Sequence, residues 1–217
     1  IKRLGGQVFR APEFPQKAVG NYAYTRRLLE TKNYKIIHVH GNALIYIYPL
    51  MIGCRNSLTC TIMHSHNTST ASPLYYPVHW FNRHRIDRLS AVRLACSDEA
   101  GKWMFGKNGD YIVVQNGIEI EKFRFQEDIR TAYRKKLGVE DQFVVGNVAR
   151  FLPSKNHLFL LQIFREILKL EPDSLLLLAG EGKEQKKTER KAKQLGIMSK
   201  VRFLGVRKDI SGLMQAM

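Results

Sequence analysis

The chain has 217 residues, of which 44% are hydrophobic and 25% charged, and its 35 Lys and Arg exceed its 19 Asp and Glu to give a net charge of +16. This is typical of a globular protein of one or two domains, and the longest apolar run, Ala43 to Cys54, is far shorter than the roughly 20 residues of a membrane-spanning helix. Three cysteines without a C-x-x-C pair do not indicate a disulfide framework, so we expect a cytoplasmic protein.

Apolar strand-like runs alternate along the chain with segments of helical periodicity. The predicted strands cover residues 35–40, 58–64, 94–97, 111–115, 143–149, 174–179 and 201–204. The predicted helices cover residues 17–31, 77–90, 98–105, 129–137, 154–170 and 184–195. Several strands are apolar almost without alternation, as strands buried on both faces are. The alternation predicts parallel βαβ units and therefore an α/β fold with helices on both faces of the sheets.

Two sheets fit the pattern better than one. The turn signal Asn116-Gly117 follows the fourth strand, and a polar region extends from there to about Gln142. We therefore expect a first domain over residues 1–117, a linker over 118–142 and a second domain over 143–217.

Two cations flank the loop that follows the strand at 143–149. Arg150 stands at the end of this strand, and Lys155 follows Ser154, the predicted N-cap of the next helix. Ligands of open α/β sheets bind beyond the carboxyl ends of the strands, and the amino terminus of a helix attracts anions. The pair is suited to a phosphate or diphosphate, although two solvated surface cations would show the same spacing, and a Walker G-x-x-x-x-G-K motif is absent.

Histidines gather in two predicted strands. In an extended segment His64 and His66 point to one face, as do His38 and His40. These histidines with Cys60 or Cys54 would be one conceivable metal cluster, but no carboxylate or further Cys/His spacing completes a recognisable site, so we expect no metal. A neutral histidine at a strand end can hydrogen-bond a substrate hydroxyl or transfer a proton, whereas His38 could equally be a structural histidine.

Two segments are locally rich in basic residues. Residues 186–194 mix both signs along a predicted helix without aromatic residues, which favours a solvated helix face over a nucleic-acid surface. Residues 79–93 combine apolar and basic side chains, which would suit either a core-facing helix with a basic outer side or an anionic membrane surface. No helix-turn-helix or RNA-recognition signature is present, so nucleic acid is not an expected partner.

Several segments together resemble a known family. NVARFLPSKNHLFLL, SLLLLAGEG and VRFLGVRKDI resemble, in order and spacing, the nucleotide-sugar-binding domain of glycosyltransferase family 4, which comprises retaining enzymes of GT-B architecture. Upstream, IIHVHGN, TIMHSHNTS, LACSDEAGKWMFG and VVQNGIEIEKF resemble the acceptor-side domain, particularly that of enzymes that build capsular or exopolysaccharide. The resemblance implies two Rossmann-like domains, a nucleotide-diphosphate sugar as donor, a glycan or lipid-linked acceptor, and neither cofactor nor metal.

The resemblance also implies roles for particular residues. Arg150 and Lys155 match the basic pair that holds the donor diphosphate. His66 best matches the acceptor-domain histidine close to the transferred sugar, although alignment alone could exchange it with His64. The residues that the resemblance implies in substrate binding are His64, Asn67, Gly180, Glu181 and Gly182. The turn at Gly180–Gly182 alone is a weak signal, because two glycines let backbone approach a ligand but also serve simple connections.

The chain departs from the family pattern at both ends. The glycine-rich loop near the amino terminus and the later pair of glutamates eight positions apart do not occur in it. We therefore expect both domains to be incomplete in this chain, and the chain alone to show at most weak diphosphate affinity and little transfer activity. The alternative function is a non-enzymatic nucleotide or phosphosugar-binding module, with a nucleic-acid-binding protein ranked third.

Overall fold

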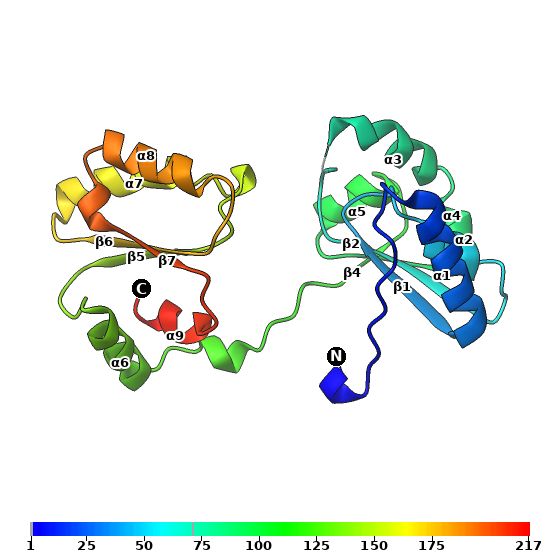
Figure 1. Cartoon of the computed structure of the whole chain (residues 1–217), viewed down its shortest axis with the longest axis horizontal. Helices are drawn as coiled ribbons and strands as arrows, with labels where there is room; N and C mark the ends of the chain where they lie inside the picture. The colour runs from blue at the N-terminus through cyan, green and yellow to red at the C-terminus, as the bar shows by residue number, and fades with distance from the viewer. Residues whose placement is uncertain (1, 71) are drawn as a thin grey trace. The chain divides into compact units, whose positions relative to one another are not determined.

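The computed structural model describes residues 2–70 and 72–217 and divides the chain into two compact units, residues 1–117 and 118–217. Each unit contains a parallel β-sheet with helices packed against it (Figure 1). This confirms the expected α/β class with two parallel sheets. No helix among the described residues is long and apolar enough to cross a bilayer.

The first unit has the strand order β1-β2-β3-β4, all parallel. Its elements are the 3₁₀ turn η1 (Lys2–Leu4), α1 (Ala18–Lys32), β1 (Ile36–Gly41), α2 (Tyr48–Gly53), β2 (Cys60–Ser65), η2 (Pro73–Tyr75), α3 (Tyr76–Arg83), α4 (Ile86–Leu89), β3 (Val92–Ala95), α5 (Asp98–Phe105) and β4 (Ile112–Val113). Because each strand lies beside its predecessor, right-handed crossovers place the connecting helices on the same face of the sheet. The burial of β1 alternates accordingly, with Ile37 and Val39 in the core and His38 and His40 exposed.

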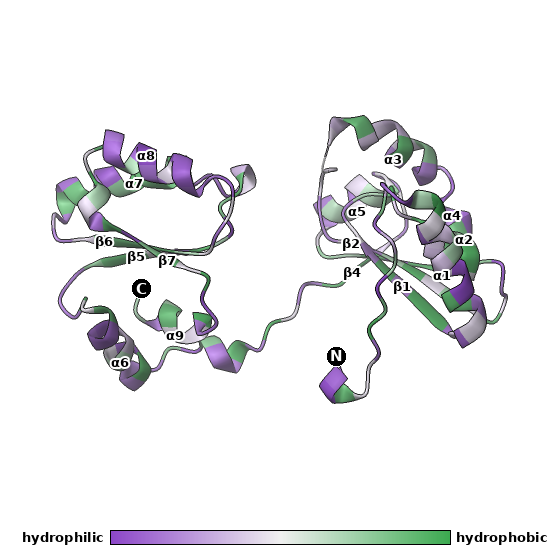
Figure 2. Cartoon of the chain, in the orientation of Figure 1, coloured by the Kyte–Doolittle hydropathy of each residue, from purple (hydrophilic) through white to green (hydrophobic). Residues whose placement is uncertain are grey.

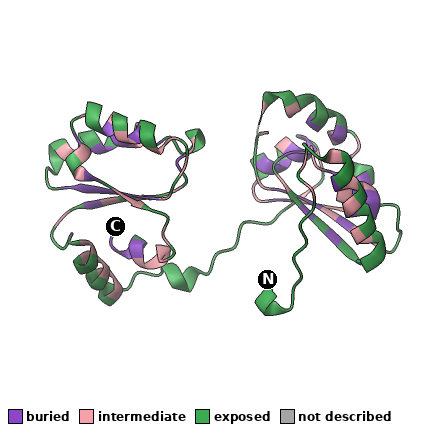
Figure 3. Cartoon of the chain, viewed as in Figure 1, coloured by how far each residue is buried: buried purple, intermediate pink, exposed green. Residues whose placement is uncertain are grey.

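The second unit has the parallel strand order β5-β6-β7. Its elements are η3 (Ile120–Phe123), α6 (Glu127–Leu137), β5 (Val144–Val148), η4 (Pro153–Lys155), α7 (His157–Leu170), β6 (Leu175–Ala179), α8 (Gln185–Gln194), η5 (Met198–Lys200), β7 (Val201–Gly205) and α9 (Ile210–Gln215). Helices α7 and α8 cover one face, and α6 and α9 lie on the other (Figure 1). The central strand β6 is buried throughout, as its unbroken apolar sequence predicts (Figure 3).

Helix α8 shows how the basic segment at 186–194 is accommodated. Thr188 and Ala192, four residues apart, are its buried residues. The rest of the helix is strongly hydrophilic (Figure 2). The lysines and arginine of this segment therefore lie mainly on the outer side of an amphipathic helix.

The stretch 118–142, expected as a linker, lies within the second unit and contains η3 and α6. Guanidinium N–H groups of Arg130 and Arg134 donate to the carbonyls of Gln215 and Ala216, at 2.7 Å and 2.9 Å. These carbonyls lie at the carboxyl end of α9, where the helix leaves acceptors unsatisfied. The polar composition of the stretch thus reflects a helix that caps α9.

Two predicted helices begin or divide differently in the structure. Ser154 is not an N-cap, because Pro153–Lys155 forms a 3₁₀ turn and α7 begins only at His157, after Asn156 in a left-handed conformation with φ of 47°. Lys155 therefore precedes the helix and is not in its first turn. The helix expected over 77–90 is divided into α3 and α4 by a turn in which the Arg85 N–H bonds the carbonyl of Asn82 at 3.0 Å.

Candidate functional site

The loops that follow β5 and β6 are joined by main-chain hydrogen bonds. The Ala149 N–H donates to the Ala179 carbonyl at 3.0 Å, and the Phe151 N–H donates to the Glu181 carbonyl at 3.0 Å. The Glu184 N–H then donates to the Phe151 carbonyl at 3.1 Å. The ladder between the two strands thus continues past their ends into the loops that the sequence marks as a candidate anion site.

Two glycines make this close approach possible. Gly180 has φ of 140°, and a Cβ on it would lie 2.1 Å from the carbonyl oxygen of Ala149. Gly182 has φ of 154°, and its Cβ would lie 2.5 Å from the carbonyl oxygen of Phe151. Both distances are far below contact, so a side chain at either position would separate the loops. The glycines therefore allow the neighbouring loop to pack closely. This explains the glycines of the AGEG turn structurally, in addition to the role in ligand binding that the resemblance implies.

Arg150 and Lys155 are both exposed within the loop that these bonds hold. Neither forms an ion pair or side-chain hydrogen bond with any residue that the structure describes. Between them Phe151 is only 1% exposed and stacks on the buried ring of His157 at 4.3 Å between centroids. Burial lowers the pKa of His157, so its ring adds no charge at neutral pH. The loop thus carries two exposed cations that have no partner among the described residues, and a buried aromatic side chain between them holds the loop in place.

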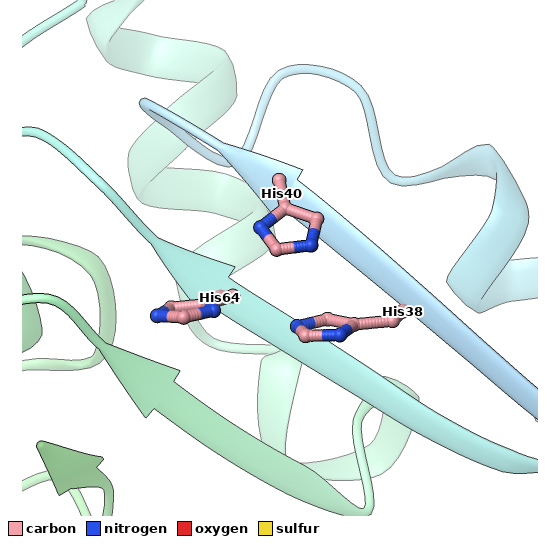
Figure 4. A group of neighbouring side chains, drawn as sticks. All are labelled: His38, His40 and His64. Atoms are coloured by element: carbon pink, nitrogen blue, oxygen red, sulfur yellow. The ribbon is translucent and has the colours of Figure 1, made fainter. Parts of the chain in front are cut away.

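The first unit brings four histidines together at the carboxyl ends of β1 and β2. His38 and His40 project from β1, His64 projects from the paired position opposite His40 in β2, and His66 follows β2 directly (Figure 4). The ring centroids of neighbouring pairs are 4.1–5.4 Å apart. The alternation within each strand predicted the shared faces, but the contact between the strands depends on their register.

His64 and His66 have different environments. His64 is 7% exposed, and desolvation, aided by the neighbouring histidines, lowers its pKa to about 4. His66 is half-buried. Its main-chain N–H donates to the Gly41 carbonyl at 3.1 Å, and its ring Nε2 lies 2.8 Å from Nδ1 of His40. His66 is therefore the member at the edge of the sheet where ligands of α/β folds bind. His38 is exposed and is not a buried structural histidine.

His40, which the sequence placed on one face with His38 without assigning it a role, belongs to the site. Its ring is the hydrogen-bonding partner of His66 across the β1–β2 pair. The pKa of His40 is lowered mainly by burial and further by the charges of His38 and His66. The exposed side chain of Asn67 accepts the Thr68 N–H at 2.8 Å, so part of its polar capacity is used locally.

The polar ACSDE strand end has a structural explanation. The Ser97 hydroxyl oxygen accepts the Ala100 N–H at 3.2 Å and so caps α5, while the Ser65 hydroxyl donates to the Ala100 carbonyl at 2.8 Å. These residues position α5 against β2, so their polar groups serve the fold.

An open cavity of about 1110 Å³ lies between α3 and α5. Its lining includes Trp80, Arg83, Lys102, Trp103 and Lys107. The guanidinium of Arg83 lies 4.8 Å from the centre of the Trp80 ring. This surface combines flat apolar rings with cations and lies on the helix side of the first unit.

Several known proteins that resemble this chain in sequence are named as glycosyltransferases. Residues 129–217, which lie in the second unit, match the model of the family described as Glycosyl transferases group 1. A putative glycosyltransferase, EpsF of Bacillus subtilis (strain 168), is 28% identical over 99% of this chain and 58% of its own length. N-acetyl-alpha-D-glucosaminyl L-malate synthase of Bacillus anthracis is 27% identical over 95% of this chain and 54% of its own length.

Solved structures show the same fold. The complex of Anabaena HepE with UDP and glucose superposes with a TM-score of 0.75 at 23% identity, over 97% of this chain and 58% of that protein. At this identity the likeness establishes the fold alone. The chain spans little more than half the length of these relatives.

Proposed function

We propose that this chain functions in a nucleotide-sugar-dependent glycosyltransferase, with the second unit holding the diphosphate of the donor. The observation that carries the proposal is the loop after β5, which main-chain bonds fix to its neighbour while Arg150 and Lys155 remain exposed and unpaired among the described residues. The family matched by residues 129–217 supports it, and Anabaena HepE was solved in complexes with UDP and with UDP-glucose.

The proposed chemistry follows from charge. Departure of the nucleoside diphosphate builds up negative charge on its phosphates, and two fixed cations stabilise that charge without a metal ion in this role. His66, held by His40, is the group proposed to lie beside the transferred sugar, with Asn67 and Gly180–Gly182 contacting substrate. The resemblance to family 4 supports retention of configuration and a role in polysaccharide biosynthesis, with a glycan or lipid-linked acceptor.

Calorimetric titration with UDP, GDP and ADP at two salt concentrations tests the donor site. Arg150→Ala and Lys155→Ala should each weaken binding by about 1.5–3 kcal/mol, or roughly tenfold or more, because each removes a charge-assisted contact. Lys193→Ala removes the same charge from an exposed position on α8 and should leave the affinity unchanged. Equal affinity of all four proteins for the diphosphates would refute the assignment of the pair.

The catalytic part of the proposal needs a separate test. Sugar transfer should survive a metal chelator and should fall strongly in His66→Ala while diphosphate binding stays intact. If the chain binds diphosphate and His66→Ala changes no measured activity, the non-enzymatic binding module is favoured instead.

We further propose contact between α3 and an anionic membrane surface, on the cytoplasmic side. Phe81 is 64% and Trp80 43% exposed, and Arg85 lies over the Phe81 ring at 5.5 Å, so cations accompany exposed apolar rings. Sedimentation with anionic liposomes should be reduced by Phe81→Ser, whereas Phe125→Ser, at the same 64% exposure, should have no effect. Equal sedimentation with neutral and anionic liposomes would contradict the electrostatic part of this proposal.

A further inference from the structure

The histidine cluster has a property that the proposed transfer reaction does not use. One ring nitrogen from each of His38, His40 and His64 lies within 4.8 Å of the others (Figure 4). We propose that these three side chains bind a divalent first-row transition-metal ion of the Zn²⁺ class.

The spacing is close to that of a metal centre. Nitrogens about 2.05 Å from a tetrahedral Zn²⁺ lie about 3.3 Å apart, so the rings must close by at most about 1.5 Å. His38 and His40 are exposed, which leaves room for their rings to turn from the present stacked arrangement. Because Nδ1 of His40 is engaged with His66 at 2.8 Å, its available ligand atom is Nε2. The backbone already brings two of the ligands together, because His40 and His64 occupy paired positions of adjacent strands.

His64 is the residue that points most directly to a missing partner. It is 93% buried, since 7% of its surface is exposed, yet neither of its ring nitrogens has a hydrogen-bond partner among the described residues. His79 shows the ordinary solution for a buried histidine in the same unit. Its Nδ1 accepts the Leu44 N–H at 3.1 Å, and its Nε2 donates to the Trp103 carbonyl at 3.3 Å. A metal bond would give His64 the partner that His79 finds in the backbone.

The donor set also selects the kind of metal. Imidazole nitrogen binds Zn²⁺, Ni²⁺ and Cu²⁺ well, whereas Mg²⁺ and Ca²⁺ require oxygen ligands, which this group of described side chains lacks. Three protein ligands leave a further coordination position open to water or another small molecule. The ion would be bound by histidines of the first unit, one of which, His40, also holds His66, whereas the proposed diphosphate ligands Arg150 and Lys155 belong to the second unit. The inference rests on the geometry of the histidines and not on the proposed function.

Binding is tested on the tag-free chain, first with Co²⁺ as a spectroscopic probe and then with Zn²⁺ in competition. We expect one ion per chain, with ligand-field bands but no thiolate charge-transfer band, and displacement by Zn²⁺. His38→Ala and His40→Ala should weaken binding by about tenfold or more, since loss of even an outer-sphere partner costs about 10–100-fold. His84→Ala removes an exposed histidine outside the cluster and serves as the matched control.

Thermal unfolding supplies an independent readout. Both tryptophans lie in the first unit, so their fluorescence should show a higher Tm with Zn²⁺ and no change with Mg²⁺. A thiolate band, or binding equal in the cluster variants and His84→Ala, would place the metal elsewhere and overturn the proposal. The same shift with Mg²⁺ would overturn it as well.

Discussion

Replacement of Gly180 by alanine should disrupt the joined loops after β5 and β6. A Cβ at Gly180 would lie 2.1 Å from the Ala149 carbonyl oxygen, and the φ of 140° disfavours any side chain. Backbone strain costs about 1–3 kcal/mol and overpacking costs about 1–3 kcal/mol, so we expect the second unit to lose about 2–6 kcal/mol of unfolding free energy. Gly196→Ala is the control, because Gly196 has φ of 70° but no described atom within 4 Å of the added Cβ, which limits the loss to about 1–2 kcal/mol.

Urea unfolding followed by circular dichroism measures this effect, and tryptophan fluorescence shows where it occurs. Both tryptophans belong to the first unit, so the fluorescence transition should stay unchanged while the dichroism transition of the second unit shifts to lower urea. Under conditions where the variant remains folded, its affinity for UDP should fall, because the loop that carries Arg150 is displaced. A loss in Gly180→Ala no greater than in Gly196→Ala would show that the loops do not approach so closely.

Three further outcomes are expected. In metal-free buffer His64→Leu should raise the free energy of unfolding measured from the fluorescence transition by about 1–3 kcal/mol, because it removes buried unpaired nitrogens; a lower free energy would show that they have partners. Ser90→Ala should lower the same free energy by about 1–3 kcal/mol, since the buried Ser90 oxygen accepts the Met63 N–H at 2.9 Å; an unchanged free energy would contradict this bond. The hydrogen bond from Arg207 lowers the pKa of Asp209 from the ordinary 3.8 to about 2. The stabilisation of the folded second unit by the ionised Asp209 is therefore complete above pH 4 and is lost as the pH falls towards 2. Unfolding of Asp209→Asn followed by dichroism should lack this acid-induced loss, and parallel pH profiles of the variant and the unmodified chain would refute the prediction.

Elements with strong local signals were predicted closely. Helix α5 has the predicted bounds Asp98–Phe105, because Ser97 supplies a cap that the sequence displays. Strand β6 is within one residue of its predicted start, because its unbroken apolar run suits burial on both faces. Helix α2 was not predicted; Pro49 lies in its first turn, where proline is tolerated.

The candidate site was predictable only as far as local pattern extends. The position of Arg150 after a strand, and the shared face of His64 and His66, follow from local spacing. The contact between His40 and His66 depends on strand register between residues 26 apart, which no local motif encodes. The later start of α7 depends on the left-handed conformation of Asn156, where the sequence offered a serine that looked like an ordinary cap.

The bonds between the loops after β5 and β6 use main-chain atoms alone, which bears on how such a site can diversify. The side chains of Ala149 and Glu181 take no part in the bonds that their backbones make, so either residue is free to change without loosening the loop. The constraint lies instead on Gly180 and Gly182, whose missing side chains create the room. In the proposed donor site, side chains around this backbone frame could therefore change the nucleotide preference without a new way of placing the cations.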